Sequence, residues 1–130
     1  YDVIFKYDDD LRKDQLILQV ISYMDSILKS VNNELGFTKY KALATSKLDG
    51  FVEFVTGSNT IAGILENNNQ LSTYLLTLNS SQNVLDSYLN SCAGYCVVTY
   101  LLGIGDRHLD NILIDRKGKL FHIDFGYILG

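Results

Sequence analysis

The sequence predicts an α+β fold, in which a small antiparallel sheet with one long helix precedes a mainly helical part. Apolar residues recur at helical spacing from Leu11 to about Val31, and again from Asn83 to Leu102. Short β-branched and aromatic runs, separated by turn residues, lie around and after these helices, as they do in antiparallel hairpins. No internal repeat is visible in the chain.

The first part of the chain reads as three strands and a helix. The strands are short apolar or β-branched runs, at residues 3–5, 40–45 and 51–55. Asp9 or Asp10 lies where a carboxylate can cap the helix that begins near Leu11, at the positive end of its dipole. Residues 32–38 are polar and indicate a loop. The turn of the following hairpin is expected at Lys47-Leu48-Asp49-Gly50.

The second part reads as mainly helical. Ser58 lies where it can cap a short helix, and a second short helix is expected at residues 71–78, after an Asn-rich loop. The helix at residues 83–102 is hydrophobic nearly all round towards its C-terminal end, which predicts that it is buried. Gly103 ends this helix, since glycine adopts the left-handed conformation that closes helices.

Two short motifs near the end of the chain carry the chemistry. Gly105-Asp106-Arg107-His108-Leu109-Asp110-Asn111 is followed by His122-Ile123-Asp124-Phe125-Gly126. A strand, a turn and a second strand lie between them, so Asn111 and Asp124 are expected at the same end of a hairpin. An amide oxygen and a carboxylate are ligands that Mg²⁺ accepts. The spacing of Asp106 and Asn111, with Asp-Phe-Gly after them, matches the kinase catalytic loop and predicts phosphoryl transfer from Mg-ATP.

These motifs, with their flanking residues, resemble the catalytic core of the phosphatidylinositol 3-kinases, and most of all the class III, vacuolar-sorting type. The flanking runs are Ser91-Cys92-Ala93-Gly94-Tyr95-Cys96, Phe121-His122 and Tyr127-Ile128-Leu129-Gly130. The resemblance covers nearly the whole chain and is weakest between Glu66 and Gln82, where the family usually carries a longer insertion. It implies a two-lobed, protein-kinase-like fold, with residues 1–56 in the N-lobe, residues 57–130 in the C-lobe and ATP in the cleft between them.

The resemblance implies roles for the catalytic-loop residues. Asn111 and Asp124 hold Mg²⁺, with Mn²⁺ as an alternative ion, and Arg107 orients the loop. The proton acceptor for the inositol hydroxyl is either Asp106, which has the position of the protein-kinase base, or His108, which the family favours. A neutral imidazole, with an ordinary pKa near ~6.5, is suited to accept that proton at neutral pH.

The resemblance also implies a nucleotide pocket. Lys6, in the family's Ile-Phe-Lys motif, neutralises ATP phosphate, and Asp14 lies beside it in the role of the helix Glu that pairs with a kinase Lys. Glu53 and Val55 bind adenine through their backbone C=O and N–H. The other expected pocket residues are Tyr40, Phe54, Leu113 and Ile123. Without the resemblance, Lys6 would be interpreted as a lysine that extends from a strand edge towards water, and Tyr40 as a core residue.

Three features set this chain apart from the whole family domain. Asp8 stands where the family has a Gly, and adds negative charge near the phosphate site. Lys13 stands where the family has a Gln. The phosphate-covering loop before the Lys strand and the activation loop after Asp-Phe-Gly are outside the sequence, so we expect a fragment that is inactive by itself.

Composition limits the classes of function. The chain has 130 residues, 47% of them hydrophobic, and a formal net charge of −4, which argues against unaided nucleic-acid binding. It has no apolar run long enough to span a membrane and no signal-peptide pattern. Cys92 and Cys96 are expected to be reduced core residues rather than a disulfide or a metal pair.

The expected function is transfer of the ATP γ-phosphate to the 3-hydroxyl of phosphatidylinositol. The resemblance implies a cytoplasmic enzyme, peripheral on endosomal, vacuolar and autophagic membranes, that acts in trafficking and autophagy. Its implied partners are membrane phosphatidylinositol, a regulatory kinase-like subunit and endosomal or autophagy complex proteins, without nucleic acid. The alternatives are a protein Ser/Thr kinase of the phosphatidylinositol-kinase-related branch, a pseudokinase and an inert scaffold; intact Lys6, Asn111 and Asp124 argue against the last two.

Overall fold

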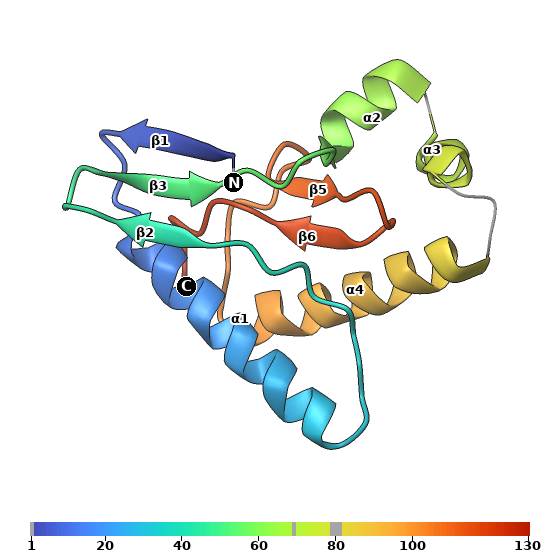
Figure 1. Cartoon of the computed structure of the whole chain (residues 1–130), viewed down its shortest axis with the longest axis horizontal. Coiled ribbons are helices and arrows are strands. Elements are labelled where there is room, and N and C mark those ends of the chain that lie inside the picture. Colours follow the sequence, from blue (N-terminus) through green and yellow to red (C-terminus); the bar gives the residue numbers. More distant parts are fainter. Residues whose placement is uncertain (1, 69, 79–81) are drawn as a thin grey trace.

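The computed structural model describes residues 2–68, 70–78 and 82–130, which form an α+β fold (Figure 1). The strands are β1 (Val3–Tyr7), β2 (Ala42–Ala44), β3 (Asp49–Glu53), β4 (Asn59–Thr60), β5 (Ile112–Ile114) and β6 (Leu120–His122). The helices are α1 (Arg12–Ser30), α2 (Ile61–Asn68), α3 (Leu71–Leu78) and α4 (Gln82–Leu101). The predicted fold class is therefore confirmed, and the two-residue strand β4 is an addition that no pattern in the sequence indicated.

Two antiparallel sheets of three strands each organise the described chain, in the orders β1-β3-β2 and β4-β5-β6. In the first sheet Lys6 pairs with Gly50, and in the second Ile112 pairs with His122. Figure 1 shows the two sheets beside each other, with α1 and α4 beneath them and α2 and α3 beyond the second sheet. The stretch that joins the sheets therefore runs from the end of β3 to the start of β4.

Two groups of buried residues fill the interior. The larger, here called the central core, consists of Ile17, Ile21, Phe37, Tyr40, Tyr95, Val98, Ile104, Leu120, Phe121 and Phe125. The smaller, here called the outer cluster, consists of Ile61, Ile64, Tyr74, Leu75, Val84 and Ile114. The central core combines residues of α1, of the stretch before β2, of α4 and of β6 with Ile104 and Phe125. The outer cluster lies among α2, α3, the start of α4 and β5.

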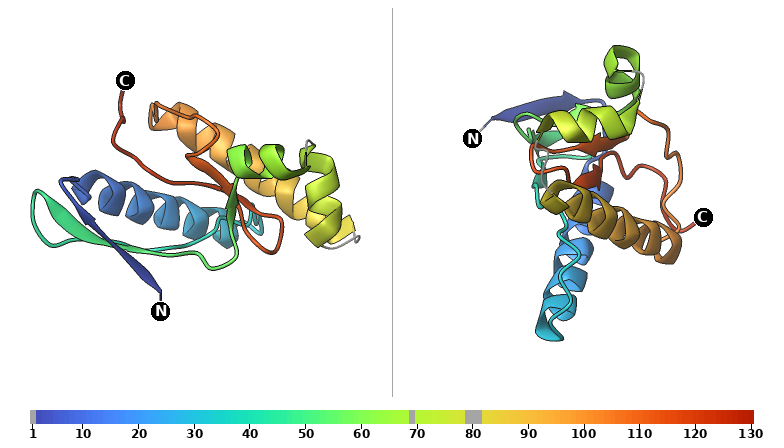
Figure 2. Two further views of the ribbon diagram at one scale, coloured as in Figure 1. Left: turned by 90° about the horizontal axis from the view of Figure 1, so that it is seen from above. Right: turned by 90° about the vertical axis from the view of Figure 1, so that its right-hand side faces the viewer.

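The C-terminal segment runs past the end of α4, as Figure 2 shows from two further sides. The Leu129 N–H donates to the Leu102 C=O at 2.9 Å, and the Gly105 N–H donates to the Tyr127 C=O at 2.9 Å. These backbone hydrogen bonds hold the residues after Asp-Phe-Gly against the residues that lead into the catalytic loop.

Two local predictions need correction. The N-cap of α2 is Thr60, whose Oγ1 accepts the Gly63 N–H at 3.1 Å, while the Ser58 hydroxyl donates to the Val55 C=O instead. The hairpin turn lies earlier than expected, because Gly50 is a residue of β3. A Cβ at Gly50 would lie 2.4 Å from the Leu43 C=O, so this glycine is required for close packing rather than for a turn.

The expectation that α4 is buried all round at its C-terminal end is also wrong. Tyr95 is fully buried, but Val97 and Tyr100 are 56% and 87% exposed. Cys92 and Cys96 are free thiols, as expected, yet Cys96 is exposed and is not a core residue. Apolar composition showed that the helix could be buried, but one face of it packs on β6 and the opposite face does not.

The start of α1 uses Asp10 but not as its N-cap residue. That position is Leu11, while the Asp10 carboxylate accepts the Arg12 N–H at 3.2 Å and also binds the Arg12 guanidinium. Asp8 has a positive φ of 60°. A left-handed backbone is the conformation that glycine adopts most easily, so Asp8 occupies a position suited to glycine.

Candidate active site

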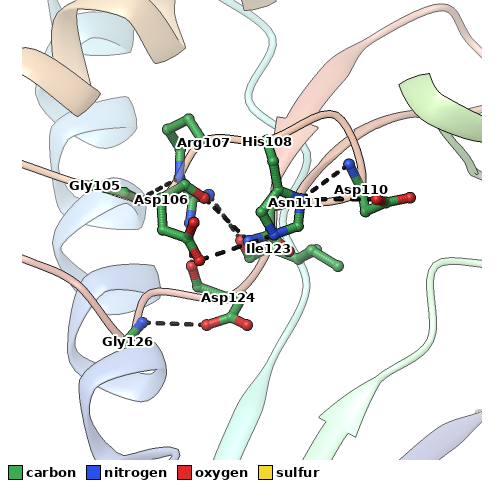
Figure 3. Close-up of polar contacts among 9 residues, drawn as sticks. All are labelled: Gly105, Asp106, Arg107, His108, Asp110, Asn111, Ile123, Asp124 and Gly126. Atoms are coloured by element: carbon green, nitrogen blue, oxygen red, sulfur yellow. Dashed lines mark hydrogen bonds and ion pairs between the residues drawn. The ribbon is translucent and has the colours of Figure 1, made fainter.

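The β5–β6 hairpin brings the two sequence motifs together (Figure 3). The Ile123 N–H donates to the Asn111 C=O at 3.0 Å, so the two motifs meet at the open end of the hairpin. At its closed end, the Asp115 carboxylate accepts the Lys117 and Lys119 N–H groups at 2.8 and 3.0 Å. The expected proximity of Asn111 and Asp124 follows from this pairing.

Arg107 ties the catalytic loop to the Asp-Phe-Gly segment. Its Nε donates to the Gly105 C=O at 2.7 Å, which fixes the side chain within its own loop. Its Nη1 donates to the Ile123 C=O at 2.8 Å, and its Nη2 donates to the Asp124 C=O. The planar guanidinium can make these contacts at once, which a lysine could not do.

Asp106 and Asp124 both adopt a positive φ, of 54° and 61°. Non-glycine residues in this region carry strain and concentrate at functional sites, and Asp tolerates the conformation better than most. The two aspartates that the motifs single out are thus the residues at which the backbone turns sharply.

The donors for a divalent metal lie on adjacent segments. The Asn111 side chain is buried, and its Nδ2 donates to the Asp106 C=O at 3.1 Å, which leaves the amide oxygen as the atom for a ligand. The Asp124 carboxylate is exposed and accepts only a long 3.3 Å contact from the Gly126 N–H among the described hydrogen bonds. No group of three or more His, Cys, Asp or Glu side chains within the described residues could hold a metal. Two oxygen ligands fit Mg²⁺, which fills its other positions with water and phosphate.

The two candidate bases are neighbours. His108 Nε2 lies 3.8 Å from the Asp106 carboxylate, and both side chains are about half exposed. The Asp110 N–H donates to His108 Nδ1 at 3.3 Å, which orients the ring. The structure thus places the two candidate bases side by side on the catalytic loop, each open to solvent.

A cavity of about 140 Å³ lies between the two sheets. It is lined by the residues expected in the nucleotide pocket, which are Lys6, Asp14, Tyr40, Glu53, Phe54, Val55, Leu113 and Ile123, and by Ile4, Val52, Ser58, Phe121 and Asp124. The motifs had not indicated Ile4, Val52, Ser58 or Phe121. Ile4 could have been found, because residues two apart on a strand point to the same face.

The residues at the end of β3 and just after it, Glu53 to Val55, line this cavity. The Glu53 N–H donates to the Lys41 C=O and the Phe54 N–H donates to the Asp2 C=O, both at 2.8 Å. The Glu53 C=O and the Val55 N–H take part in none of the turn and loop hydrogen bonds within residues 2–68, 70–78 and 82–130. These two groups are the ones expected to bind adenine.

The predicted pairing of Lys6 with Asp14 is not found. Lys6 Nζ pairs with the Asp9 carboxylate at 2.8 Å. Asp14 is 7% exposed, and its Oδ1 accepts the Phe125 N–H at 3.1 Å. Burial raises the pKa of Asp14, although the hydrogen bond from Phe125 opposes this effect. The helical period placed Asp14 on the inner face correctly, but its partner is a backbone group of a segment far along the chain.

Tyr40 is both a core residue and a lining residue of the cavity. It is 6% exposed within the central core, and it also lines the cavity. Its hydroxyl donates to the His122 C=O at 3.0 Å, and this bond joins the stretch before β2 to β6. Burial, assisted by the charge of Arg107, lowers the pKa of His122 to about 4, so this imidazole is neutral at physiological pH.

None of the helices in the described ranges is both long and apolar enough to cross a membrane.

Comparison with known proteins gives one consistent family. The sequence profile of "Phosphatidylinositol 3- and 4-kinase" matches residues 1–84 and 69–130. The chain is 49% identical to "Phosphatidylinositol 3-kinase VPS34" of Saccharomyces cerevisiae over 100% of this chain and 16% of that protein. It is 47% identical to the root isoform of phosphatidylinositol 3-kinase of Glycine max, over 98% of this chain and 17% of the relative.

A third relative, "Phosphatidylinositol 3-kinase pik3" of Schizosaccharomyces pombe, is 47% identical over 100% of this chain and 18% of its own length. The chain thus spans less than a fifth of the length of these curated relatives. The match nevertheless covers both motifs and the cavity described above, and the chain belongs to the phosphatidylinositol 3- and 4-kinase family.

Proposed function

We propose that this chain is part of a lipid kinase that transfers the ATP γ-phosphate to the 3-hydroxyl of phosphatidylinositol. One observation carries the proposal: a single cavity is lined by Lys6, by the Glu53–Val55 stretch and by Asp124, in a chain that is 49% identical to a phosphatidylinositol 3-kinase. Residues 1–56 would form the N-lobe side of this cavity and residues 57–130 the C-lobe side.

The chain's own residues divide the work of the reaction. Glu53 and Val55 bind adenine through the backbone, and Lys6 neutralises phosphate charge once Asp9 gives up its contact. Asn111 and Asp124 would hold Mg²⁺, or Mn²⁺, which would neutralise charge on the phosphates. Arg107 keeps the two motifs in register through the Ile123 and Asp124 carbonyls.

The resemblance to the class III type motivates a finer proposal. We propose that the substrate is phosphatidylinositol in endosomal, vacuolar or autophagic membranes, and that the enzyme is a peripheral cytoplasmic protein with a regulatory kinase-like subunit. The names of the relatives state the lipid, and this favours a lipid kinase over a protein kinase of the related branch.

The variant Asp124→Asn of the full-length protein tests the proposal. Asparagine tolerates the positive φ of Asp124 and keeps its size, so the fold should persist while the metal loses its carboxylate. Phosphorylation of phosphatidylinositol with Mg-ATP should be abolished, with an unchanged unfolding midpoint. Phosphorylation of the lipid by the Asp124→Asn variant would refute the assignment. If the parent protein phosphorylated a peptide but not the lipid, the protein-kinase alternative would be favoured.

The choice of base needs a separate pair of variants. If His108 accepts the inositol proton, His108→Ala should lower kcat about 10²–10⁴-fold and remove the fall in rate on the acid side of the pH profile. If Asp106 is the base, Asp106→Asn should cause that loss, and His108→Ala should leave the acid side in place. We favour His108, and near-normal kcat in His108→Ala with an unchanged pH profile would show that choice to be wrong.

A further inference from the structure

The first turn of α1 contacts the backbone of the Asp-Phe-Gly segment at two successive residues. Asp14 Oδ1 accepts the Phe125 N–H at 3.1 Å in a buried position. The neighbouring Lys13 Nζ donates to the Gly126 C=O at 2.9 Å at the surface. Both contacts join residues more than a hundred positions apart, so they hold α1 against the Asp-Phe-Gly segment.

The same segment is held from its other side by the catalytic loop. Arg107 donates to the Ile123 and Asp124 carbonyls. Four successive residues, from 123 to 126, therefore each have a backbone group bound by a side chain from another element. The Phe125 ring is fully buried in the central core, which fixes the middle of the segment.

The Asp124 side chain contrasts with this backbone. It is exposed, and its contact with the Gly126 N–H is 3.3 Å long. Its carboxylate is consequently placed by the backbone on either side of it rather than by contacts of its own. A shift of the Phe125 or Gly126 peptide group would move the carboxylate directly.

We propose that Lys13 and Asp14 are positioning residues that hold the Phe125 and Gly126 peptide groups and so aim the Asp124 carboxylate at the metal. The inference rests on the proposed function in one respect, the role of Asp124 as a metal ligand. It departs from the expected role of Asp14, since the contact of Asp14 is with the Phe125 N–H and the ion pair of Lys6 is with Asp9. It also gives a role to Lys13, which stands where the family has a Gln.

The variants are chosen to show whether Asp14 acts as a hydrogen-bond acceptor or through its negative charge. Asp14→Asn keeps a side-chain oxygen that can accept the Phe125 N–H, whereas Asp14→Leu removes the acceptor at similar size. Lys13→Met removes the donor to Gly126, and Lys13→Gln keeps a shorter one. Arg12→Met is the matched control, because Arg12 is an exposed cation on the same turn that pairs with Asp10 instead.

The first measurement is amide hydrogen exchange at residues 123–127. It uses the full-length protein, purified without metal or nucleotide. Exchange should rise about tenfold at Phe125 in Asp14→Leu, and a few-fold around Gly126 in Lys13→Met. Asp14→Asn, Lys13→Gln and Arg12→Met should stay close to the parent protein.

The second measurement is the free Mg²⁺ concentration that half-saturates nucleotide binding. It should rise in Asp14→Leu and Lys13→Met, while nucleotide affinity without Mg²⁺ changes less. Lys13 is exposed, so its variants keep the test open even if Asp14→Leu disrupts the packing.

Two results would overturn the inference. Exchange at Phe125 and Gly126 that is unchanged in both Asp14→Leu and Lys13→Met would show that the contacts do not hold the segment. An Asp14→Asn variant as impaired as Asp14→Leu would show that Asp14 acts through its charge. If the parent protein phosphorylated no phosphatidylinositol but these exchange results held, the proposed function would fail and the positioning role would stand.

Discussion

The central core and the outer cluster are both well buried, yet only the central core touches the candidate active site. Tyr40 and Phe121 belong to it and line the cavity, and Phe125 lies within the Asp-Phe-Gly segment. The outer cluster contributes none of the cavity's lining residues. Strand β5 connects the two, because Leu113 packs against the central core while the fully buried Ile114 belongs to the outer cluster.

This difference separates two kinds of support. The central core positions the reacting groups, because Tyr40 and Phe121 line the cavity and Phe125 follows Asp124 directly. The outer cluster stabilises the β5–β6 hairpin from the side that faces away from the cavity. Substitutions in the two groups should therefore have similar effects on stability and different effects on metal and nucleotide binding.

The largest effect is expected from Phe125→Ala, in the central core. Phe125 is 0% exposed, and removing a buried Phe ring typically costs about 3–5 kcal/mol of stability. The backbone on both sides of Asp124 would also lose its anchor, so Mg²⁺-dependent nucleotide binding should weaken. Chemical denaturation and nucleotide titration, each with and without Mg²⁺, would measure the two effects separately.

Ile64→Ala is the matched substitution in the outer cluster. Ile64 is 2% exposed, and truncation of a buried Ile typically costs about 2–5 kcal/mol. At a temperature where the variant is folded, its Mg²⁺-dependent nucleotide affinity should equal that of the parent. A weakened affinity would mean that the outer cluster positions the hairpin as well, and the contrast between the two groups would then be wrong.

A pH titration of stability sharpens the same comparison. His122, beside the central core, has its pKa lowered to about 4 by burial and by Arg107, whereas an unfolded His titrates near ~6.5. Between these values the unfolded chain binds the extra proton, so stability is complete above ~6.5 and falls as the pH drops towards 4. The loss should be on the order of 3 kcal/mol, at about 1.4 kcal/mol per pH unit.

The control for this prediction is His122→Phe, which keeps a ring next to Tyr95 but cannot titrate. Denaturation midpoints of the variant should be flatter than those of the parent between pH 6.5 and 4. A parent protein with constant stability over that range would contradict the buried, neutral state of His122.

The smallest effect is expected at Asp8, outside both groups. Its φ of 60° is unfavourable for most residues, so Asp8→Gly should stabilise the protein by at most about 1 kcal/mol. Because the variant removes a negative charge expected near the phosphate site, it should not weaken nucleotide binding. Thermal unfolding would detect the gain. A loss of stability instead would show that the Asp8 side chain has a favourable role that outweighs its backbone conformation.

Much of the site could be predicted from the sequence because its residues lie close together along the chain. The hairpin between Asn111 and Asp124 is local, and the residue spacing of the two motifs is enough to indicate it. The helices were found because apolar periodicity is a local signal. The pocket residues came from the family resemblance, since no local pattern joins Lys6 to Ile123.

The errors concern contacts that depend on three-dimensional packing. The partner of Asp14 is set by where α1 docks on a segment 111 residues away. The exposure of Val97 and Tyr100 depends on which face of α4 meets β6, and composition alone does not contain that information. Thr60 rather than Ser58 caps α2 because the short strand β4 moves the helix start, and a strand of two residues leaves no periodic pattern.

The unequal sequence separations around the Asp-Phe-Gly segment have a consequence for the order of folding. The Arg107 contact with Ile123 closes a loop of 16 residues, whereas the Asp14 contact with Phe125 closes one of 111. Short loops close faster and at lower entropic cost, so the catalytic hairpin can assemble on its own before α1 docks. During synthesis α1 leaves the ribosome before Phe125 and Gly126 are made, so its contacts with these two residues can form only after the catalytic loop has also been made.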